Sequence, residues 1–293
     1  MTTPPDRRTV LVGAMAALAG LSAGMAACSV RPEPDSSPSV SPAPTPPKHI
    51  RRLKVRVANQ VSRSRDDLVF GLETLGDDTA VESVEGSSGG VLRAFSLSND
   101  QTLRTAALPQ AGIGQGLARI GSVLYQGVRD QNQIHLWSLP ELTHRGTVEI
   151  EGQALGLCYD SQNNLLWRSD GGPTLYPHDP DTMELAGHPL LVLAGQNPAG
   201  PLGELAFADG SIWAVRHRTD RIVQIDTTEG FVRSEVDASS LRHLAHDEGL
   251  DLTDGTAVLC GLNVDPASGS LLITGARWPV MFDVSLVEQH DQG

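Results

Sequence analysis

Five short stretches of similar sequence carry the side chains of this chain that could do chemistry. They are Phe70-Gly71-Leu72, Gln115-Gly116-Leu117, Leu155-Gly156-Leu157, Gly203-Glu204-Leu205 and Cys260-Gly261-Leu262. The last one brings a thiol, Cys260, into otherwise apolar sequence, and His217 is an imidazole that could act with it. A thiolate beside an imidazole is a recurring pair of nucleophile and base, whereas a buried Cys packs as a small apolar side chain. The sequence leaves both alternatives open, and we expect the second.

The same five stretches repeat along the chain. The spacing between them is roughly 40 to 57 residues, in the range of propeller blades. A turn rich in Gly, Asp or Asn follows each one, and then come two apolar strands, for example VLYQGV from Val123 and IHLWSL from Ile134. Alternation with a period of two and frequent turn signals predict an all-β fold. Five units of about 45 residues predict a five-bladed β-propeller over residues 55–286, with its first strands around a central channel; residues 287–293 are a tail.

Residues 1–28 have the pattern of an export signal. Arg7 and Arg8 precede the apolar run LVGAMAALAGLSAGMAA, which ends in small residues at Cys28. This is the order of a charged region, an apolar region and a cleavage site. The run resembles a bacterial lipoprotein signal, in which the Cys is lipidated, and the Arg pair resembles a twin-arginine signal. We expect export and a lipid anchor at Cys28 on the outer face of the cell membrane; the alternatives are a simple signal peptide and a spanning anchor.

A Pro- and Ser-rich segment, residues 29–54, follows Cys28. Its composition prevents a packed core and favours extended conformations, so we predict a tether. At about 3.1 Å per residue, roughly twenty residues would hold a domain on the order of 60 Å from the membrane. The formal net charge of the chain is -13, and Lys48 and Lys54 are its only lysines. Because a phosphate-binding surface needs a basic field, we expect no nucleic acid partner.

Metal and disulfide chemistry are not expected. Two cysteines besides the lipidated one, Cys158 and Cys260, lie in apolar strand-like sequence, and we predict that both are free buried thiols. His243 and His246 are spaced as on one helical face, within residues 231–255, which we interpret as an outer strand, a short helix and a loop. Two His without a nearby third ligand are a weak metal signal. We therefore assign no metal and no cofactor.

The chain resembles a known family in three places. LLWRSDGGPTLYPHDPDTMEL, GELAFADGSIWAV with TDRIVQID, and TGARWPVMFDV are similar to motifs of the plant-type glutamine cyclotransferases, whose closing motif is Thr-Gly-Lys-Arg-Trp-Pro. The resemblance covers roughly residues 66 to 286. It implies a five-bladed propeller that converts N-terminal glutamine to pyroglutamate without a metal. In that reaction the α-amine attacks the γ-carboxamide carbon and ammonia leaves, so proton transfers and an orienting pocket are needed.

The resemblance also implies a site. The acidic residue of the family's Tyr-Glu-Ser-Thr-Gly motif matches Glu82 in AVESVEG, which makes Glu82 the candidate general acid and base. The residue before each repeat Gly should lie on an innermost strand and face one axial pocket. These residues, joined by Arg129 and His217 from the neighbouring strand, are Phe70, Gln115, Leu155, Gly203 and Cys260. The family has Gln, Glu, Trp, Asn and Asn at these five positions, and tryptophans at the other two.

Most pocket positions thus depart from the family pattern, and more than one function stays open. The chain is an exported, lipid-anchored propeller of this family that cyclises glutamine, or a non-catalytic surface propeller that binds a peptide or small ligand at its axial mouth. A third alternative is another amide-directed enzyme that uses Glu82, Cys260 and His217. Glu82 itself has an alternative as an ordinary carboxylate paired with Arg129. We expect a monomer.

Overall fold

The computed structural model describes residues 45–64, 68–76, 78–86, 89–265 and 268–289. These residues form β-strands connected by turns, together with the α-helix α1 (Ser239–Asp247). The predicted all-β class is therefore confirmed. Within the described ranges, no helix is both long and apolar enough to cross a membrane. The expected export signal with Cys28, and the tether up to residue 44, lie outside the described residues.

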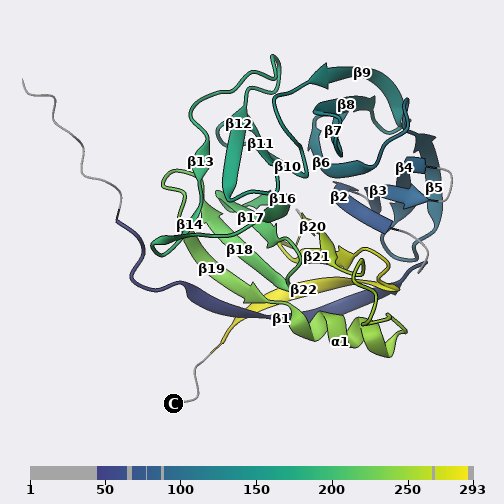
Figure 1. The fold of residues 1–293 in the computed structure, drawn as a ribbon. Coiled ribbons are helices and arrows are strands. Elements are labelled where there is room, and N and C mark those ends of the chain that lie inside the picture. Colours follow the sequence, from purple (N-terminus) through teal and green to yellow (C-terminus); the bar gives the residue numbers. More distant parts are fainter. Residues whose placement is uncertain (1–44, 65–67, 77, 87–88, 266–267, 290–293) are drawn as a thin grey trace, which may run out of the picture. The chain divides into compact units, whose positions relative to one another are not determined.

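Runs of four sequential antiparallel strands repeat along the chain (Figure 1). Three of these runs are separate sheets. The first is β2 (Leu68–Gly76), β3 (Thr79–Gly86), β4 (Gly89–Ser96) and β5 (Thr102–Ala107). The second is β6 (Gly114–Ile120), β7 (Val123–Val128), β8 (Gln133–Ser138) and β9 (Thr143–Glu149). The third is β10 (Gly156–Asp160), β11 (Leu165–Ser169), β12 (Thr174–His178) and β13 (Leu190–Leu191).

An eight-stranded sheet contains two further runs. One is β16 (Leu202–Ala208), β17 (Ser211–Arg216), β18 (Arg221–Asp226) and β19 (Val232–Asp237). The other is β20 (Leu259–Val264), β21 (Leu271–Gly275) and β22 (Val280–Glu288), completed by β1 (Arg51–Ser62) from the other end of the described chain. Strand β1 joins the two runs, because it pairs in parallel with β19 and antiparallel with β22. A small hairpin of β14 (Leu193–Ala194) and β15 (Asn197–Pro198) lies between the third and fourth runs in sequence.

Strand β1 corrects the predicted limits of the domain. The tether was expected to reach residue 54, but β1 begins at Arg51, and β22 continues to Glu288 rather than ending at 286. Leu53 is buried in the core and lies opposite Val236 of β19 and Glu288 of β22. The apolar alternation that starts at Leu53 is therefore part of a strand, and its partners come from segments far away in the sequence.

The first strand of each run carries one of the repeated tripeptides. These strands, β2, β6, β10, β16 and β20, contact one another in cyclic order, and Figure 1 shows them innermost. The tripeptide glycines allow the close approach of their backbones. A Cβ on Gly116 would lie 2.5 Å from the Cα of Gly156, and one on Gly156 would lie 2.1 Å from the carbonyl oxygen of Gly203. Glycine is therefore required there by space.

The hydrophobic core lies between neighbouring runs of strands. Val81 of the first run packs with Leu117 of the second, and further clusters join the second to the third, the third to the fourth and the fourth to the fifth. Phe95 of the first run packs with Met281 of the fifth. Each run therefore buries its faces only through its two neighbours. This arrangement supports a single cooperative domain.

Candidate functional site

A cavity of about 430 Å³ opens at the N-terminal ends of the inner strands. The first residue of each repeated tripeptide lines it, and so do Arg129, which directly follows β7, and His217, which directly follows β17. The structure thus brings together all seven residues predicted for the pocket, which are Phe70, Gln115, Arg129, Leu155, Gly203, His217 and Cys260. The lining combines apolar side chains with a guanidinium, an amide and an imidazole.

Arg129 is held against Phe70. Its guanidinium carbon lies 4.5 Å from the centroid of the Phe70 ring, a favourable cation–π distance. The Arg129 side chain is half-buried. Burial lowers the pKa of nearby His217, and the positive charges of Arg218 and Arg129 lower it further. Arg129 makes no ion pair with any residue in the described ranges. It therefore presents hydrogen-bond donors to the cavity.

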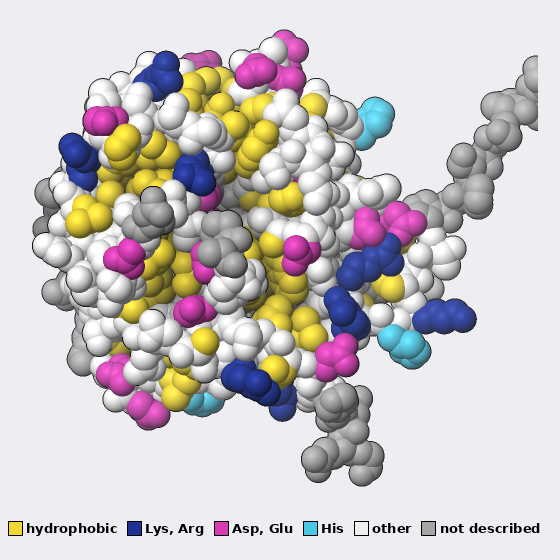
Figure 2. Space-filling model, turned by 180° about the vertical axis from the view of Figure 1, so that it is seen from behind, with side chains coloured by type: hydrophobic (Ala, Val, Ile, Leu, Met, Phe, Trp, Pro, Cys, Tyr) yellow, Lys and Arg dark blue, Asp and Glu magenta, His cyan; other side chains and the backbone are white. Residues whose placement is uncertain are grey.

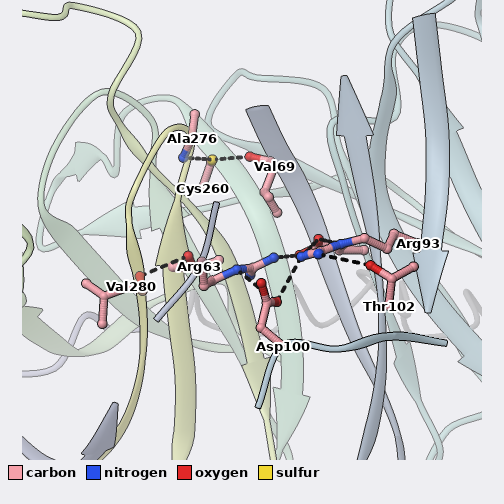
Figure 3. A network of polar contacts seen from close by, with 10 residues as sticks. Arg63, Val69, Arg93, Asp100, Thr102, Cys260, Ala276 and Val280 are labelled. Atoms are coloured by element: carbon pink, nitrogen blue, oxygen red, sulfur yellow. Dashed lines mark hydrogen bonds and ion pairs between the residues drawn. The ribbon is translucent and has the colours of Figure 1, made fainter. Parts of the chain in front are cut away.

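Cys260 is a hydrogen-bonded thiol. Its Sγ donates to the carbonyl oxygen of Val69 at 2.7 Å and accepts the backbone N–H of Ala276 at 3.1 Å (Figure 3). Burial raises the pKa of this thiol to about 12. Cys158, the other described cysteine, is also free and buried, as predicted. Because neither hydrogen bond of Cys260 goes to His217, the geometry supports a packing role and not a nucleophile.

Glu82 lies in a buried network of charges. Its Oε1 accepts a hydrogen bond of 2.6 Å from Nε of Arg93, and its Oε2 accepts one from Nη2 of Arg63. Arg93 also donates to Asp100 at 2.9 Å, and Figure 3 shows Arg63, Arg93 and Asp100 converging. Both guanidinium carbons lie 5.0 Å from the ring centroid of Phe95. The carboxylate is fully buried, and both of its oxygens are engaged.

Glu82 does not line the cavity, and its predicted pairing with Arg129 is wrong. The cause is its place in the sheet. Glu82 on β3 lies directly opposite Arg93 on β4, so their side chains share one face. Arg63 follows β1, and its backbone N–H donates to Pro279, so the fifth run brings it to the same point.

Glu204 is a cavity residue that no sequence motif predicted. It lines the cavity and is 3% exposed, and neither carboxyl oxygen has a hydrogen-bond partner. Burial raises the pKa of this carboxyl well above its usual range; the backbone amides of Leu117 and Leu72 oppose the rise without reaching normal hydrogen-bond geometry, and Glu73 adds to it. Burial therefore favours the protonated, neutral form of this carboxyl. The signal in the sequence is Glu at a position where the other four tripeptides have Gly.

Gly203 is not required by space. A Cβ at this position would find its nearest atoms at 3.7 Å, the carbonyl oxygen of Val215, and at 3.8 Å, Nδ1 of His217. A small side chain therefore fits, in contrast to the neighbouring tripeptide glycines. His243 and His246 lie in α1, and among the residues that the structure describes no three His, Cys, Asp or Glu gather as metal ligands.

Fold and site together define a β-repeat domain whose innermost strands surround a single axis, with a cavity at one end of it. A model of the glutamine cyclotransferase family matches residues 24–286. The chain belongs to this family. It is 25% identical over 234 residues to the glutaminyl-peptide cyclotransferase of Arabidopsis thaliana, covering 80% of this chain and 71% of the plant protein. The crystal structure of Myxococcus xanthus glutaminyl cyclase matches with a TM-score of 0.75 and 29% identity, over 83% of this chain and all of the other.

Proposed function

We propose that the described domain is a five-bladed β-propeller whose axial cavity binds a peptide N-terminus or another small ligand, and that it cyclises N-terminal glutamine slowly or not at all. The cyclic contacts of the five inner strands support the number of blades. The chain is exported and anchored through a lipid on Cys28, a proposal that rests on the order of charged, apolar and small residues before that Cys.

The position of Glu82 carries the proposal on activity. Cyclisation needs a group that takes a proton from the amine and returns one to the departing ammonia. Glu82 matches the family's acidic residue, yet both of its oxygens bind guanidinium groups in a network away from the cavity. A carboxylate held in this way has no free oxygen for a substrate amine. The chemistry would need Glu82 to leave two ion pairs, which is costly for a buried charge.

The cavity itself favours a ligand with an acceptor group and an apolar part. Arg129 offers donors, and a peptide carbonyl or a carboxylate would satisfy them. Gln115 uses its amide nitrogen to bind the carbonyl of Gly114 at 3.1 Å, which leaves its amide oxygen as an acceptor. Phe70 and Leu155 supply the apolar wall. A peptide N-terminus with an apolar side chain combines these features.

Glutamine cyclisation is the second candidate. It is favoured by the family to which the chain belongs and by the names of both relatives, a glutaminyl-peptide cyclotransferase and a glutaminyl cyclase. In that case Glu204, a cavity carboxyl whose pKa is raised by burial, is the group that remains to give a proton to ammonia. The two candidates differ in one observable, the loss of ammonia from a peptide that begins with glutamine.

The test combines turnover and binding. Mass spectrometry follows ammonia loss from a Gln-initiated peptide with the wild type and with Glu82→Gln, and calorimetry measures peptide binding. We expect no cyclisation above the uncatalysed rate, and binding that weakens about ten-fold in Arg129→Gln, since a hydrogen bond to a charged group contributes about 1.5 kcal/mol or more. Arg104→Gln, an exposed position on β5, is the matched control and should bind normally. Rapid cyclisation that disappears in Glu82→Gln would overturn the proposal in favour of the family reaction.

A further inference from the structure

Basic side chains gather on the first segment of the domain. Residues 48–56, KHIRRLKVR, hold five Lys or Arg and no acidic residue, and both lysines of the chain are among them. All five cationic side chains are exposed. The chain as a whole carries a formal net charge of -13, so this segment has the opposite sign to the rest of the protein.

Strand β1 turns several of these side chains to one face. Leu53 packs into the core and Val55 and Val57 pack against it, so Arg52, Lys54 and Arg56 point away from the core. Ion pairs bring two further arginines from β17 and β18 to the same place. We call this set the basic face; it consists of Arg52, Lys54, Arg56, Arg216 and Arg221.

Acidic side chains neutralise the basic face only in part. Glu235 pairs with Arg52, Arg216 and Arg221, and Asp237 pairs with Arg221 at 3.1 Å and also acts on Lys54. Asp220 also acts on Arg221. Three carboxylates therefore serve five cations. Arg56 lies opposite Ser285 of β22, a neutral neighbour.

Other nearby groups do not cancel this surplus. Glu288 lies opposite Leu53, so its side chain shares the core-facing side of the sheet. Arg51 lies two residues before Leu53, so it also points to the core-facing side, where it donates to the neutral amide of Gln224 at 3.2 Å. Lys48 precedes the strand and is exposed. Figure 2 shows dark-blue Lys and Arg side chains gathered at the right of the view, with a few acidic groups among them.

We propose that the basic face docks on the anionic phospholipid headgroups of a membrane. Electrostatic attraction to a bilayer acts within a Debye length, about 8 Å at physiological ionic strength, so a cluster on one face can bind while the acidic remainder of the domain points away. Each Lys or Arg at an anionic surface strengthens binding by about five-fold. The inference goes beyond the proposed ligand site, and it relies on the proposed lipid anchor only for the nearness of a membrane.

The position of the segment in the chain favours a membrane over other polyanions. Lys48 follows Cys28 by twenty residues, so the basic segment is the first part of the domain after the expected anchor. A lipid chain and a basic cluster are the two signals that together give stable attachment to a membrane. The contact would set which side of the domain turns to the bilayer.

Sedimentation with vesicles tests the contact itself. Residues 44–293 form a compact unit of their own, so a chain that starts at Pro44 removes the apolar export segment from the measurement. We expect it to bind vesicles of phosphatidylcholine mixed with phosphatidylglycerol, not to bind phosphatidylcholine alone, and to dissociate at high salt. Lys54→Gln with Arg56→Gln should weaken binding about 25-fold, the product of two five-fold effects.

A matched variant makes the result specific. Arg104→Gln with Arg145→Gln changes the net charge equally at exposed positions on β5 and β9, and it should bind almost as well as the parent chain. Equal binding to neutral vesicles, an equal loss in both double variants, or binding to duplex DNA in place of vesicles would each overturn the proposal. All four positions are exposed, so the thermal midpoint should stay within a few degrees of the parent and reports a folding defect directly. An absence of vesicle binding would not contradict the proposed ligand site or the proposed lipid anchor, because each of these has its own test.

Discussion

Replacement of Glu82 by Gln is expected to lower the free energy of unfolding by about 3 kcal/mol. The substitution keeps the shape of the side chain but removes the charge between Arg63 and Arg93, whose side chains are 2% and 11% exposed. Removing one partner of a buried ion pair costs about 3–5 kcal/mol, because the remaining charge is left without compensation. Asp100 stays within 2.9 Å of Arg93 and 3.6 Å of Arg63, so we take the lower end of that range.

Urea and thermal unfolding, followed by circular dichroism at pH 7, measure this effect. For domains of this size a loss of 1 kcal/mol shifts the midpoint temperature by about 2–4 °C, so a decrease of about 6–12 °C is expected. Glu85→Gln is the control, because Glu85 lies on the same strand, lines the cavity and is half-buried. Its effect should stay within about 0.5 kcal/mol.

A second variant separates a lost ion pair from a local packing defect. In the Glu82→Gln background, Arg63→Met removes one of the two uncompensated cations, so the double variant should be more stable than the sum of the single effects, by about 0.5–3 kcal/mol. The reasoning fails if Glu82→Gln unfolds within about 1 kcal/mol of the wild type. It fails most clearly if that variant is stable and has lost a measurable cyclisation activity, since Glu82 would then serve the reaction and not the fold.

Further predictions concern the axis, the inner strands and the anchor. Burial raises the pKa of Glu204 above its usual value of 4.5, so the folded chain holds this proton where the unfolded chain releases it, and stability should fall as the pH rises from 4.5. Glu204→Gln should make this fall less steep in urea titrations, and a smaller fall should remain because burial also raises the pKa of Glu73, to about 8. Gly156→Ala should cost more than about 3 kcal/mol or prevent folding, because its Cβ would lie 2.1 Å from a backbone oxygen. Gly203→Ala should change unfolding by less than about 1 kcal/mol, and similar losses for both alanine variants would contradict the packing argument. Cys28→Ser should move the protein from the membrane to the soluble fraction, and a variant that stays membrane-bound and unprocessed would speak for a spanning helix.

Local sequence was enough for the strands and for the ring of pocket residues. The segment VLYQGV, read as a strand from Val123, coincides with β7, and SIWAVR from Ser211 coincides with β17. Such strands follow from alternation and from turn residues, which act over a few positions. The five tripeptides occupy equivalent positions in the five runs. This equivalence alone predicted that Phe70 and Cys260 line the same cavity, although nothing was known of their contacts.

The partners of charged groups were decided by tertiary structure. Glu82 binds Arg63, which directly follows β1, and β1 joins the last run of strands through β22. No local pattern reports this, because the pairing depends on how the two ends of the domain meet. The raised pKa of Glu204 has the same origin, since it depends on the burial that the neighbouring inner strands create. Residue types and their period in the sequence determined which side chains surround the axis. Only the tertiary structure decided which of these side chains are paired, which have shifted pKa values and which can contact a ligand. These properties depend on distances and desolvation between segments that are far apart in the sequence.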